Sequence, residues 1–208
     1  MAKSSIGFST PGRGEEAVLE VKINLSFPHA YDVEVLSEIP SGGGTGGCLY
    51  FPRMGRSSGH GGIILRVTPH AREFAPWVGV FSSGDSSRSD RFSGVFSCPS
   101  ENTLCVVAGG RGYFCTAAAP LQYQEVPVIP VTDLRAIPAQ SLLVFSSFTS
   151  VMGWGGNGMV WKSSRLSLDG LEITGVDDDY VSGRARLPVG FEGVDFKLSL
   201  KTGERVGL

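Results

Sequence analysis

The residues that best suit ligand binding gather in and just after one glycine-rich stretch, Leu142 to Trp161. Two tryptophans flank its central turn, and an arginine and an aspartate follow shortly afterwards. Indole faces can stack a sugar ring or anchor a protein partner, while amide, guanidinium and carboxylate groups supply hydrogen bonds. Core packing is the alternative role for both tryptophans. The candidate ligand-binding residues are Trp154, Trp161, Asn157, Arg165 and Asp169.

Residues arranged for catalysis are harder to find. A serine hydrolase needs a nucleophile on a sharp turn, a histidine base and an orienting carboxylate. Ser58 lies near His60, but no G-x-S-x-G motif surrounds it, so we name no catalytic residue. Several acids can converge as the paired carboxylates of a glycosidase, and they can equally be ordinary residues of turns and strand faces. These acids are Asp133, Asp169, Glu172, Asp177 and Asp195.

Motifs for phosphate and metal binding are incomplete. The run Ser41 to Gly47 is glycine-rich, but no Gly-Lys-Ser/Thr follows it, so it does not match a nucleotide-binding P-loop. Asp177-Asp178-Asp179 lacks the spaced ligands and central glycine of an EF-hand. The cysteines contain no C-x-x-C pair, and we expect no metal and no cofactor.

The four cysteines are expected to be reduced thiols. We predict that Cys98, Cys105 and Cys115 are mostly buried and that Cys48, beside the glycine run, is the most accessible. Cys105 and Cys115 fall in the two arms of one predicted hairpin, where they can face each other. A disulfide between them is the alternative.

Composition excludes some classes of partner. The net charge is −2 and only 18% of residues are charged, without a basic cluster for neutralising phosphates, so we predict no nucleic-acid binding. No apolar run is long enough for a secretory signal or a membrane span, so we expect a soluble cytoplasmic protein without a membrane partner. Hydrophobic residues at 41% and 29 glycines predict a compact fold with many tight turns.

The central stretch predicts a β-hairpin. Gly155-Gly156-Asn157-Gly158 separates two apolar runs, Ser150–Trp154 and Met159–Lys162. Asn and Gly adopt positive φ at low steric cost, so we predict a mirror-image turn with two consecutive residues of positive φ. On this interpretation Trp154 and Trp161 point from opposite arms toward the same side of the sheet.

Similar hairpin patterns occur elsewhere along the chain. Gly109-Gly110-Arg111-Gly112 lies about 46 residues upstream, Lys201-Thr202-Gly203-Glu204 lies downstream, and Gly59-His60-Gly61-Gly62 precedes the strand Ile63–Val67. A spacing of roughly 46–50 residues is typical of propeller blades. We therefore predict an all-β fold of antiparallel hairpin repeats in a small propeller-like array. A two-sheet sandwich or barrel is the alternative.

No charged or proline-rich linker divides the chain, so residues 15–208 are predicted to form a single all-β domain. Residues 1–14 carry Ser, Gly and Pro with little apolar pattern and predict a flexible lead-in. Prolines recur between Tyr123 and Pro138, which confines that segment to edge strands or a crossing between sheets.

The C-terminal third resembles a group of uncharacterised, mainly bacterial all-β proteins. The resemblance rests on W-K-S-S-R-L-S-L-D-G-L-E-I, from Trp161 to Ile173, and on D-F-K-L-S-L-K-T-G-E, from Asp195 to Glu204. These motifs form turns and alternating strands, and the group implies no activity.

Taken together, the sequence favours a non-catalytic binding or scaffold module of unknown partner. The alternative is a carbohydrate-binding or small-molecule-binding protein, or a hydrolase, that uses a tryptophan and an acid in a cleft. A deep cleft with converging acids favours the alternative, whereas a flat apolar patch favours a protein partner.

Overall fold

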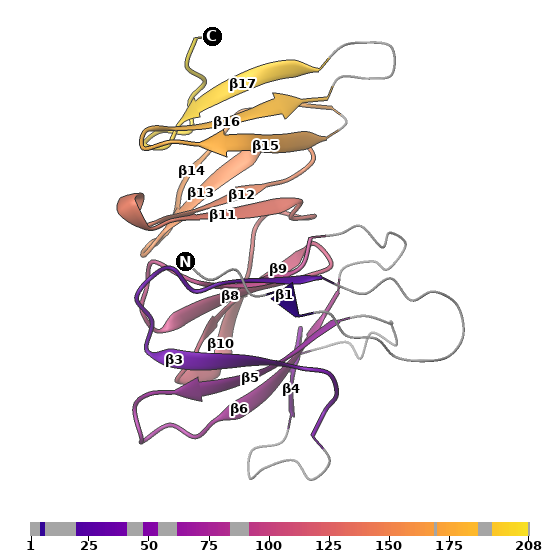
Figure 1. Ribbon diagram of the computed structural model, residues 1–208, viewed down its shortest axis with the longest axis vertical. Helices are drawn as coiled ribbons and strands as arrows, with labels where there is room; N and C mark the ends of the chain where they lie inside the picture. Colours follow the sequence, from indigo (N-terminus) through magenta and orange to yellow (C-terminus); the bar gives the residue numbers. More distant parts are fainter. Residues whose placement is uncertain are drawn as a thin grey trace, which may run out of the picture.

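Strands make up almost all of the regular structure. The structure is a computed structural model that describes residues 20–40, 48–53, 62–83, 92–168, 170–186 and 193–207, together with the backbone of residues 5–6. These residues contain seventeen β-strands, one short 3-10 helix (Pro138–Gln140) and no α-helix (Figure 1). The predicted all-β class is therefore confirmed.

The strands form four sheets with mainly antiparallel pairing. The first sheet has the strand order β3-β5-β6-β4, the second β1-β2-β7-β8-β9-β10, the third β11-β12-β13-β14 and the fourth β15-β16-β17. The first sheet comprises β3 (Tyr31–Leu36), β4 (Cys48–Phe51), β5 (Gly62–Pro69) and β6 (Trp77–Ser82). The second comprises β1 (Ser5–Ile6), β2 (Val21–Asn24), β7 (Gly94–Ser97), β8 (Thr103–Ala108), β9 (Arg111–Thr116) and β10 (Ala119–Glu125). The third comprises β11 (Asp133–Ile137), β12 (Leu142–Ser146), β13 (Val151–Gly155) and β14 (Gly158–Lys162), and the fourth β15 (Leu171–Val176), β16 (Tyr180–Ala185) and β17 (Val194–Ser199).

The four sheets are stacked face to face along the long axis of the molecule (Figure 1). Three separate hydrophobic cores fill the spaces between successive sheets. The first core contains Tyr31 and Phe51, the second Phe96 and Phe145, and the third Trp161 and Phe196. The two inner sheets are thus covered on both faces, whereas the first and fourth sheets each cover a core with one face only.

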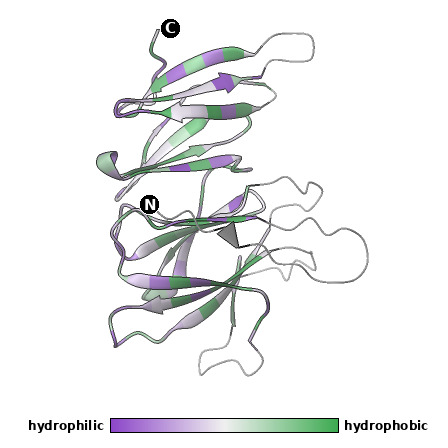
Figure 2. Cartoon of the chain, viewed as in Figure 1, coloured by the Kyte–Doolittle hydropathy of each residue, from purple (hydrophilic) through white to green (hydrophobic). Residues whose placement is uncertain are grey.

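Alternating side chains explain this layering. Along β5 every second residue is buried, from Ile63 through Leu65 to Val67, because successive side chains of a strand point to opposite faces. β8, in the second sheet, is instead buried at nearly every position, because it has a core on each face. Figure 2 shows the hydrophobic and hydrophilic residues distributed along these strands.

Two of the predicted hairpins are present, but their turns differ. In the β8–β9 hairpin Gly109 and Gly110 both have positive φ, 52° and 81°, as a mirror-image turn requires. In the β13–β14 hairpin only Gly158 does, at 114°. The prediction of two consecutive positive φ angles was therefore wrong for the central turn, although its strands pair as expected.

The other two repeats depart from the prediction. After β17, Gly203 closes a tight turn with φ of 69°, and a single bridge joins Leu198 to Arg205. Residues 54–61, which include most of the predicted turn before Gly62, lie outside the described residues, and the strands on either side, β4 and β5, are not neighbours in their sheet. The sheets are not closed into a barrel, and the propeller-like array is not confirmed.

Several sequence predictions concern the ends and the connections. Ser5–Ile6, inside the predicted lead-in, pairs with β2, while the rest of residues 1–14 lies outside the described residues. β10 and β11 are edge strands, and the proline-rich segment between them crosses from the second sheet to the third, as expected. None of the helical structure described here reaches the length and hydrophobicity needed to cross a membrane.

Candidate functional site

A cleft between the second and third sheets contains two of the predicted ligand-binding residues, Trp154 and Asn157. It consists of two adjoining cavities of about 440 Å³ and about 470 Å³, and both residues line both cavities. These volumes fall within the range of small-molecule sites. We call this feature the Trp154 cleft, lined chiefly by Phe114, Gln122, Gln124, Trp154 and Asn157.

Two strands that lie at the edges of the described sheets flank the cleft. Gln122 and Gln124 lie two residues apart on β10, the edge strand of the second sheet, so both side chains leave the same face of that strand. Met159 and Lys162 come from β14, the edge strand of the third sheet, and line the second cavity. The ring of Trp154 stacks on Phe114 with centroids 4.4 Å apart and an interplanar angle of 18°, which fixes the indole across the gap between the sheets.

A β-bulge in β14 decides which tryptophan faces this cleft. Trp154 pairs with Met159 but Gly153 pairs with Trp161, so Val160 is an extra residue on β14. Without it, Trp161 would oppose Met152 and share a face with Trp154. A shift of one residue moves a side chain to the other face, and Trp161 accordingly enters the third core. The prediction that both tryptophans point to one side was wrong for this reason.

Trp161 is held firmly in that core and does not reach the cleft. Its indole N–H donates to the carbonyl oxygen of Leu200 at 2.6 Å. The ring packs so closely on the backbones of Gly153 and Gly203 that a Cβ at either position would lie 2.4 Å from a ring carbon. Only 6% of Trp161 is exposed, so its role here is packing.

The indole N–H of Trp154 differs from those of the other two tryptophans in its hydrogen bonding. Trp77 and Trp161 donate their indole N–H groups to the carbonyl oxygens of Ala117 and Leu200. The indole N–H of Trp154 has no partner in the described part of the chain, and it is not a buried group. It is a free hydrogen-bond donor on an aromatic ring that borders both cavities.

The amides of the cleft are also available. Gln122, Gln124 and Asn157 are exposed, and their side chains make no hydrogen bond to the described residues. Each amide offers one acceptor oxygen and two N–H donors. Gln140, by contrast, uses its amide to donate to the carbonyl oxygen of Asp178 at 2.8 Å. The cleft thus combines an aromatic platform with three unpaired amides.

Two thiols lie at the inner wall of the first cavity. Cys98 and Cys115 line it but are almost fully buried, and Cys105 lies near them. Burial raises the pKa of all three thiols well above its ordinary value. They are therefore neutral and unreactive at pH 7.

The predicted pattern of cysteine burial is confirmed. Cys48 is partly exposed and the other three are buried, all as free thiols. Leu104 pairs with Cys115 and Phe114 pairs with Cys105, so Cys105 and Cys115 point to opposite faces of the second sheet. They do not face each other.

The remaining predicted ligand-binding residues are not gathered at the cleft. Arg165 is exposed on the connection between β14 and β15, where its Nε donates to the carbonyl oxygen of Ser167 at 3.1 Å. Asp169 lies outside the described residues, as do Ser58 and His60.

The other candidate acids do not gather at the cleft, although Glu172 and Asp195 both lie opposite Arg184 on the fourth sheet. Asp133 binds Arg135 at 2.7 Å on the third sheet, and Glu172 and Asp195 lie on the fourth. Asp177 accepts the backbone N–H groups of Asp179 and Tyr180, which lowers its pKa and organises the β15–β16 turn. The described lining of the cleft contains neither Asp nor Glu.

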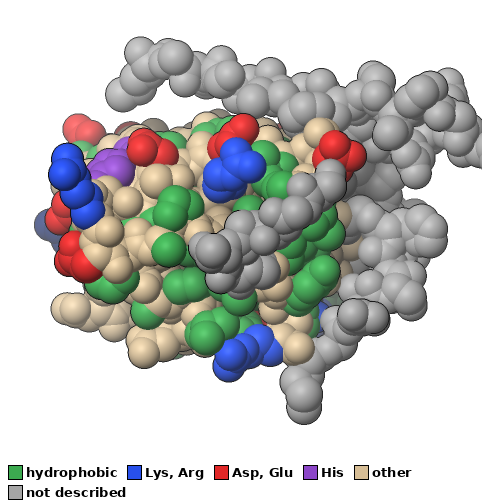
Figure 3. Space-filling model, turned by 90° about the horizontal axis from the view of Figure 1, so that it is seen from below, with side chains coloured by type: hydrophobic (Ala, Val, Ile, Leu, Met, Phe, Trp, Pro, Cys, Tyr) green, Lys and Arg blue, Asp and Glu red, His purple; other side chains and the backbone are tan. Residues whose placement is uncertain are grey.

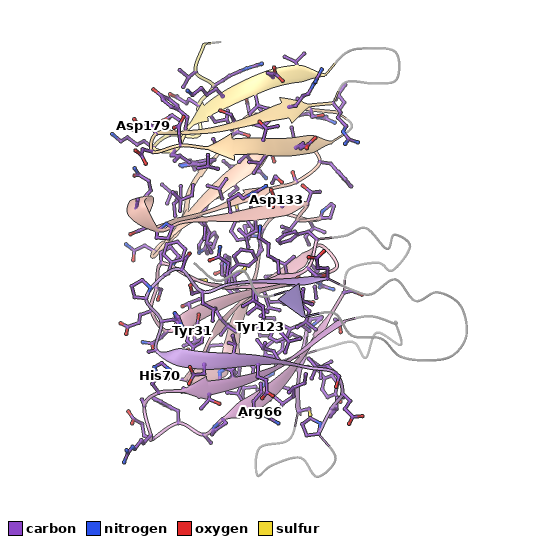
Figure 4. The ribbon with its side chains drawn as sticks, viewed as in Figure 1. Tyr31, Arg66, His70, Tyr123, Asp133 and Asp179 are labelled. Atoms are coloured by element: carbon purple, nitrogen blue, oxygen red, sulfur yellow. The ribbon has the colours of Figure 1, made fainter. Side chains whose placement is uncertain are left out.

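Within the described ranges, no group of three or more His, Cys, Asp and Glu side chains is placed to hold a metal ion. His70 contacts Asp32 at 3.4 Å on the exposed side of the first sheet, and His29 contacts the carbonyl oxygen of Phe27. Figure 4 labels His70, Asp133 and Asp179, which lie far apart: His70 follows the end of β5, Asp133 begins β11 and Asp179 is in the β15–β16 turn. In the part of the chain that the structure describes, neither histidine bonds a nucleophile, as a triad requires.

Sequence reasoning missed three residues of the cleft: Phe114, Gln122 and Gln124. The sequence gives a local signal only for the two glutamines. The alternation Leu121-Gln122-Tyr123-Gln124 indicates that they share one face of a strand. No pattern in the sequence indicates that this strand lies beside the β13–β14 hairpin.

No protein-family model and no curated protein matches this sequence.

Proposed function

We propose that this chain is a non-catalytic binding module that holds a neutral, hydroxyl-rich ligand of the glycan type in the Trp154 cleft. The observation that carries this proposal is the free indole N–H of Trp154 beside the three unpaired amides of Gln122, Gln124 and Asn157. An aromatic ring can pack on the apolar face of a sugar, and amides can both donate to and accept from hydroxyl groups.

The charge of the cleft supports a neutral ligand. Lys162 is the only residue with a formal charge in the described lining of the two cavities. An anionic ligand needs charge-assisted donors, and a cationic one needs carboxylates. Hydrolysis of a glycosidic bond requires a pair of acids, which this lining does not supply. Binding without catalysis is therefore the better supported alternative.

A test combines a glycan array with thermal unfolding. Neutral oligosaccharides of glucose, mannose and N-acetylglucosamine are screened against the wild type and against Trp154→Ala, Asn157→Ala and Gln124→Ala. A ligand at ten times its Kd stabilises the native state by about 1.4 kcal/mol and raises Tm by about 3–6 °C. Removing the Trp154 ring should weaken binding by about 2 kcal/mol, a factor of about thirty.

Gln140→Ala is the matched control, because its amide bonds to Asp178 on a different part of the molecule. It should bind like the wild type. Asn157 and Gln124 are exposed, so their variants should fold normally even if Trp154→Ala is destabilised. A glycan that binds all four variants with wild-type affinity would contradict the assignment to this cleft.

A scaffold role has one observation of its own in its favour. Four partly exposed apolar side chains, Leu36, Tyr50, Ile64 and Val80, lie side by side on the outer face of the first sheet, and such a group suits a protein partner better than a small ligand.

A further inference from the structure

The two cavities of the Trp154 cleft differ in the side chains that line them. Both are bordered by the ring of Trp154, so a ligand that packs on this ring can extend into either one. The first cavity adds hydroxyl and amide groups, such as that of Gln122. The second, of about 470 Å³, adds instead Pro127, Met159 and Lys162. The cleft therefore offers different chemistry to two parts of one ligand.

The bulge at Val160 places Met159 and Lys162 on the same face of β14. Met159 pairs with Trp154 and Lys162 pairs with Met152, and directly paired residues of neighbouring strands point to the same side. Trp154 and Met152 face the second core, so Met159 and Lys162 also face the second sheet. Their partners lie two residues apart on β13, which is a distance of about 7 Å along one face of a strand.

Both side chains are exposed where they line the second cavity. Met159 is 56% exposed, and the ammonium group of Lys162 makes no ion pair or hydrogen bond to the described residues. At the first-sheet end of the molecule, hydrophobic side chains occupy the middle of the described surface and most charged groups lie toward its margins (Figure 3). In the second cavity an apolar and a cationic side chain are neighbours, so one ligand group can contact both.

The hydrogen-bonding capacity of this cavity favours an acetyl group. A lysine ammonium donates hydrogen bonds and cannot accept them, which matches a carbonyl oxygen better than a hydroxyl group with a proton of its own. The methyl group of an acetyl suits the apolar surface of Met159 and Pro127. A carboxylate would instead place a charge against these two apolar side chains, with a single cation to compensate for its lost hydration.

We propose that the second cavity binds the acetyl group of an N-acetylated sugar unit, so that the ligand of the Trp154 cleft is an oligosaccharide of the N-acetylhexosamine type. This inference rests on the proposed glycan-binding function. The acetyl methyl group packs on Met159, and the acetyl carbonyl oxygen accepts a hydrogen bond from Nζ of Lys162. The hydroxyl groups of the chain bind the amides of the first cavity. Met159 and Lys162 thus determine specificity, while Trp154 supplies the common platform.

The test compares three trimers by isothermal titration calorimetry. β-1,4-linked trimers of N-acetylglucosamine, glucose and glucosamine differ only in the acetamido, hydroxyl or amino group at carbon 2. The N-acetylglucosamine trimer should bind about tenfold more tightly than the glucose trimer, because its acetyl group buries a methyl group and accepts a charge-assisted hydrogen bond. The glucosamine trimer should bind no more tightly than the glucose trimer, because Lys162 repels its ammonium groups.

Substitutions separate the two contacts. Lys162→Met and Met159→Ser should each reduce the preference for the acetylated trimer to about threefold, and the double variant should abolish it. Affinity for the glucose trimer should stay within about twofold of the wild type. Both residues are exposed, so these variants should keep the wild-type Tm. Lys201→Met is the matched control, because Lys201 is an exposed lysine in the turn after β17, outside the lining of the cleft. It should keep the full preference.

The outcomes distinguish this inference from the proposed function. Equal affinity of the wild type for the acetylated and glucose trimers would overturn the inference alone. The same holds for tighter binding of a galacturonic acid trimer, for a preference that the double variant retains, and for one that Lys201→Met removes. If neither trimer binds while another neutral oligosaccharide does, the inference again fails and the proposed function stands. Failure of every neutral oligosaccharide to bind would overturn both.

Discussion

Replacing Gly153 with alanine tests how the β13–β14 hairpin divides its two tryptophans between the cleft and the third core. The added Cβ would lie 2.4 Å from Cε2 of Trp161, far inside van der Waals contact. The ring cannot move away, because the backbone of Gly203 lies on it and its N–H is bonded to the carbonyl oxygen of Leu200. The substitution must therefore displace either the ring or the strand.

The expected cost follows from these contacts. Overpacking a well-filled core costs about 1–3 kcal/mol, and breaking the buried indole hydrogen bond costs about 1 kcal/mol more. Gly153→Ala should therefore lower the free energy of unfolding by about 2–4 kcal/mol. With an m value of about 2 kcal/mol/M, the urea midpoint followed by far-UV circular dichroism should fall by about 1–2 M.

Gly156→Ala is the control in the same hairpin. A Cβ at Gly156 would meet nothing within 4 Å, and this residue is outside the left-handed region. Its midpoint should match that of the wild type or rise slightly, because alanine restricts the unfolded chain. Equal midpoints for Gly153→Ala and the wild type would show that the packing of Trp161 on Gly153 is wrong.

Three further predictions concern the turn, the pH dependence and the thiols. Gly158→Val should lower the free energy of unfolding by about 1–3 kcal/mol because φ is 114° there, and an unchanged urea midpoint would refute the turn geometry. Burial raises the pKa of Tyr31, Tyr113 and the three buried thiols, so the folded state holds these protons more tightly than the unfolded state. Stability should be full at neutral pH and fall above about pH 8.5, and a constant midpoint from pH 8 to 11 would contradict this. Alkylation of native protein followed by mass spectrometry should modify Cys48 well before the other cysteines, and early labelling of Cys105 would contradict its burial.

The sequence predicts local structure well where its pattern is regular. Alternation in Ile63–Val67 and in Val194 to Leu200 indicates strands, and both are strands in the structure. Glycine pairs mark the β8–β9 and β13–β14 turns correctly. These features depend on neighbouring residues, so a local pattern is sufficient to reveal them.

Pairing between distant segments leaves no such signal. β2 lies parallel to β7, and β4 lies parallel to β6, and neither arrangement can be read from the intervening residues. The same limit explains the cleft, because Gln124 and Trp154 meet only through the stacking of two sheets. The bulge at Val160 is a further case, since one extra residue sends Trp161 to the opposite face without any change in the apolar pattern.

The most direct test of the central claim is the response of the three indole N–H signals in a ¹H–¹⁵N NMR titration. The chain has three tryptophans, Trp77, Trp154 and Trp161, and two of their N–H groups are already bonded to backbone carbonyls. Titration with a neutral oligosaccharide selected from the array should shift the signal of Trp154 and leave the other two in place. Saturable binding that shifts Trp77 or Trp161 while the Trp154 signal stays fixed would contradict the account.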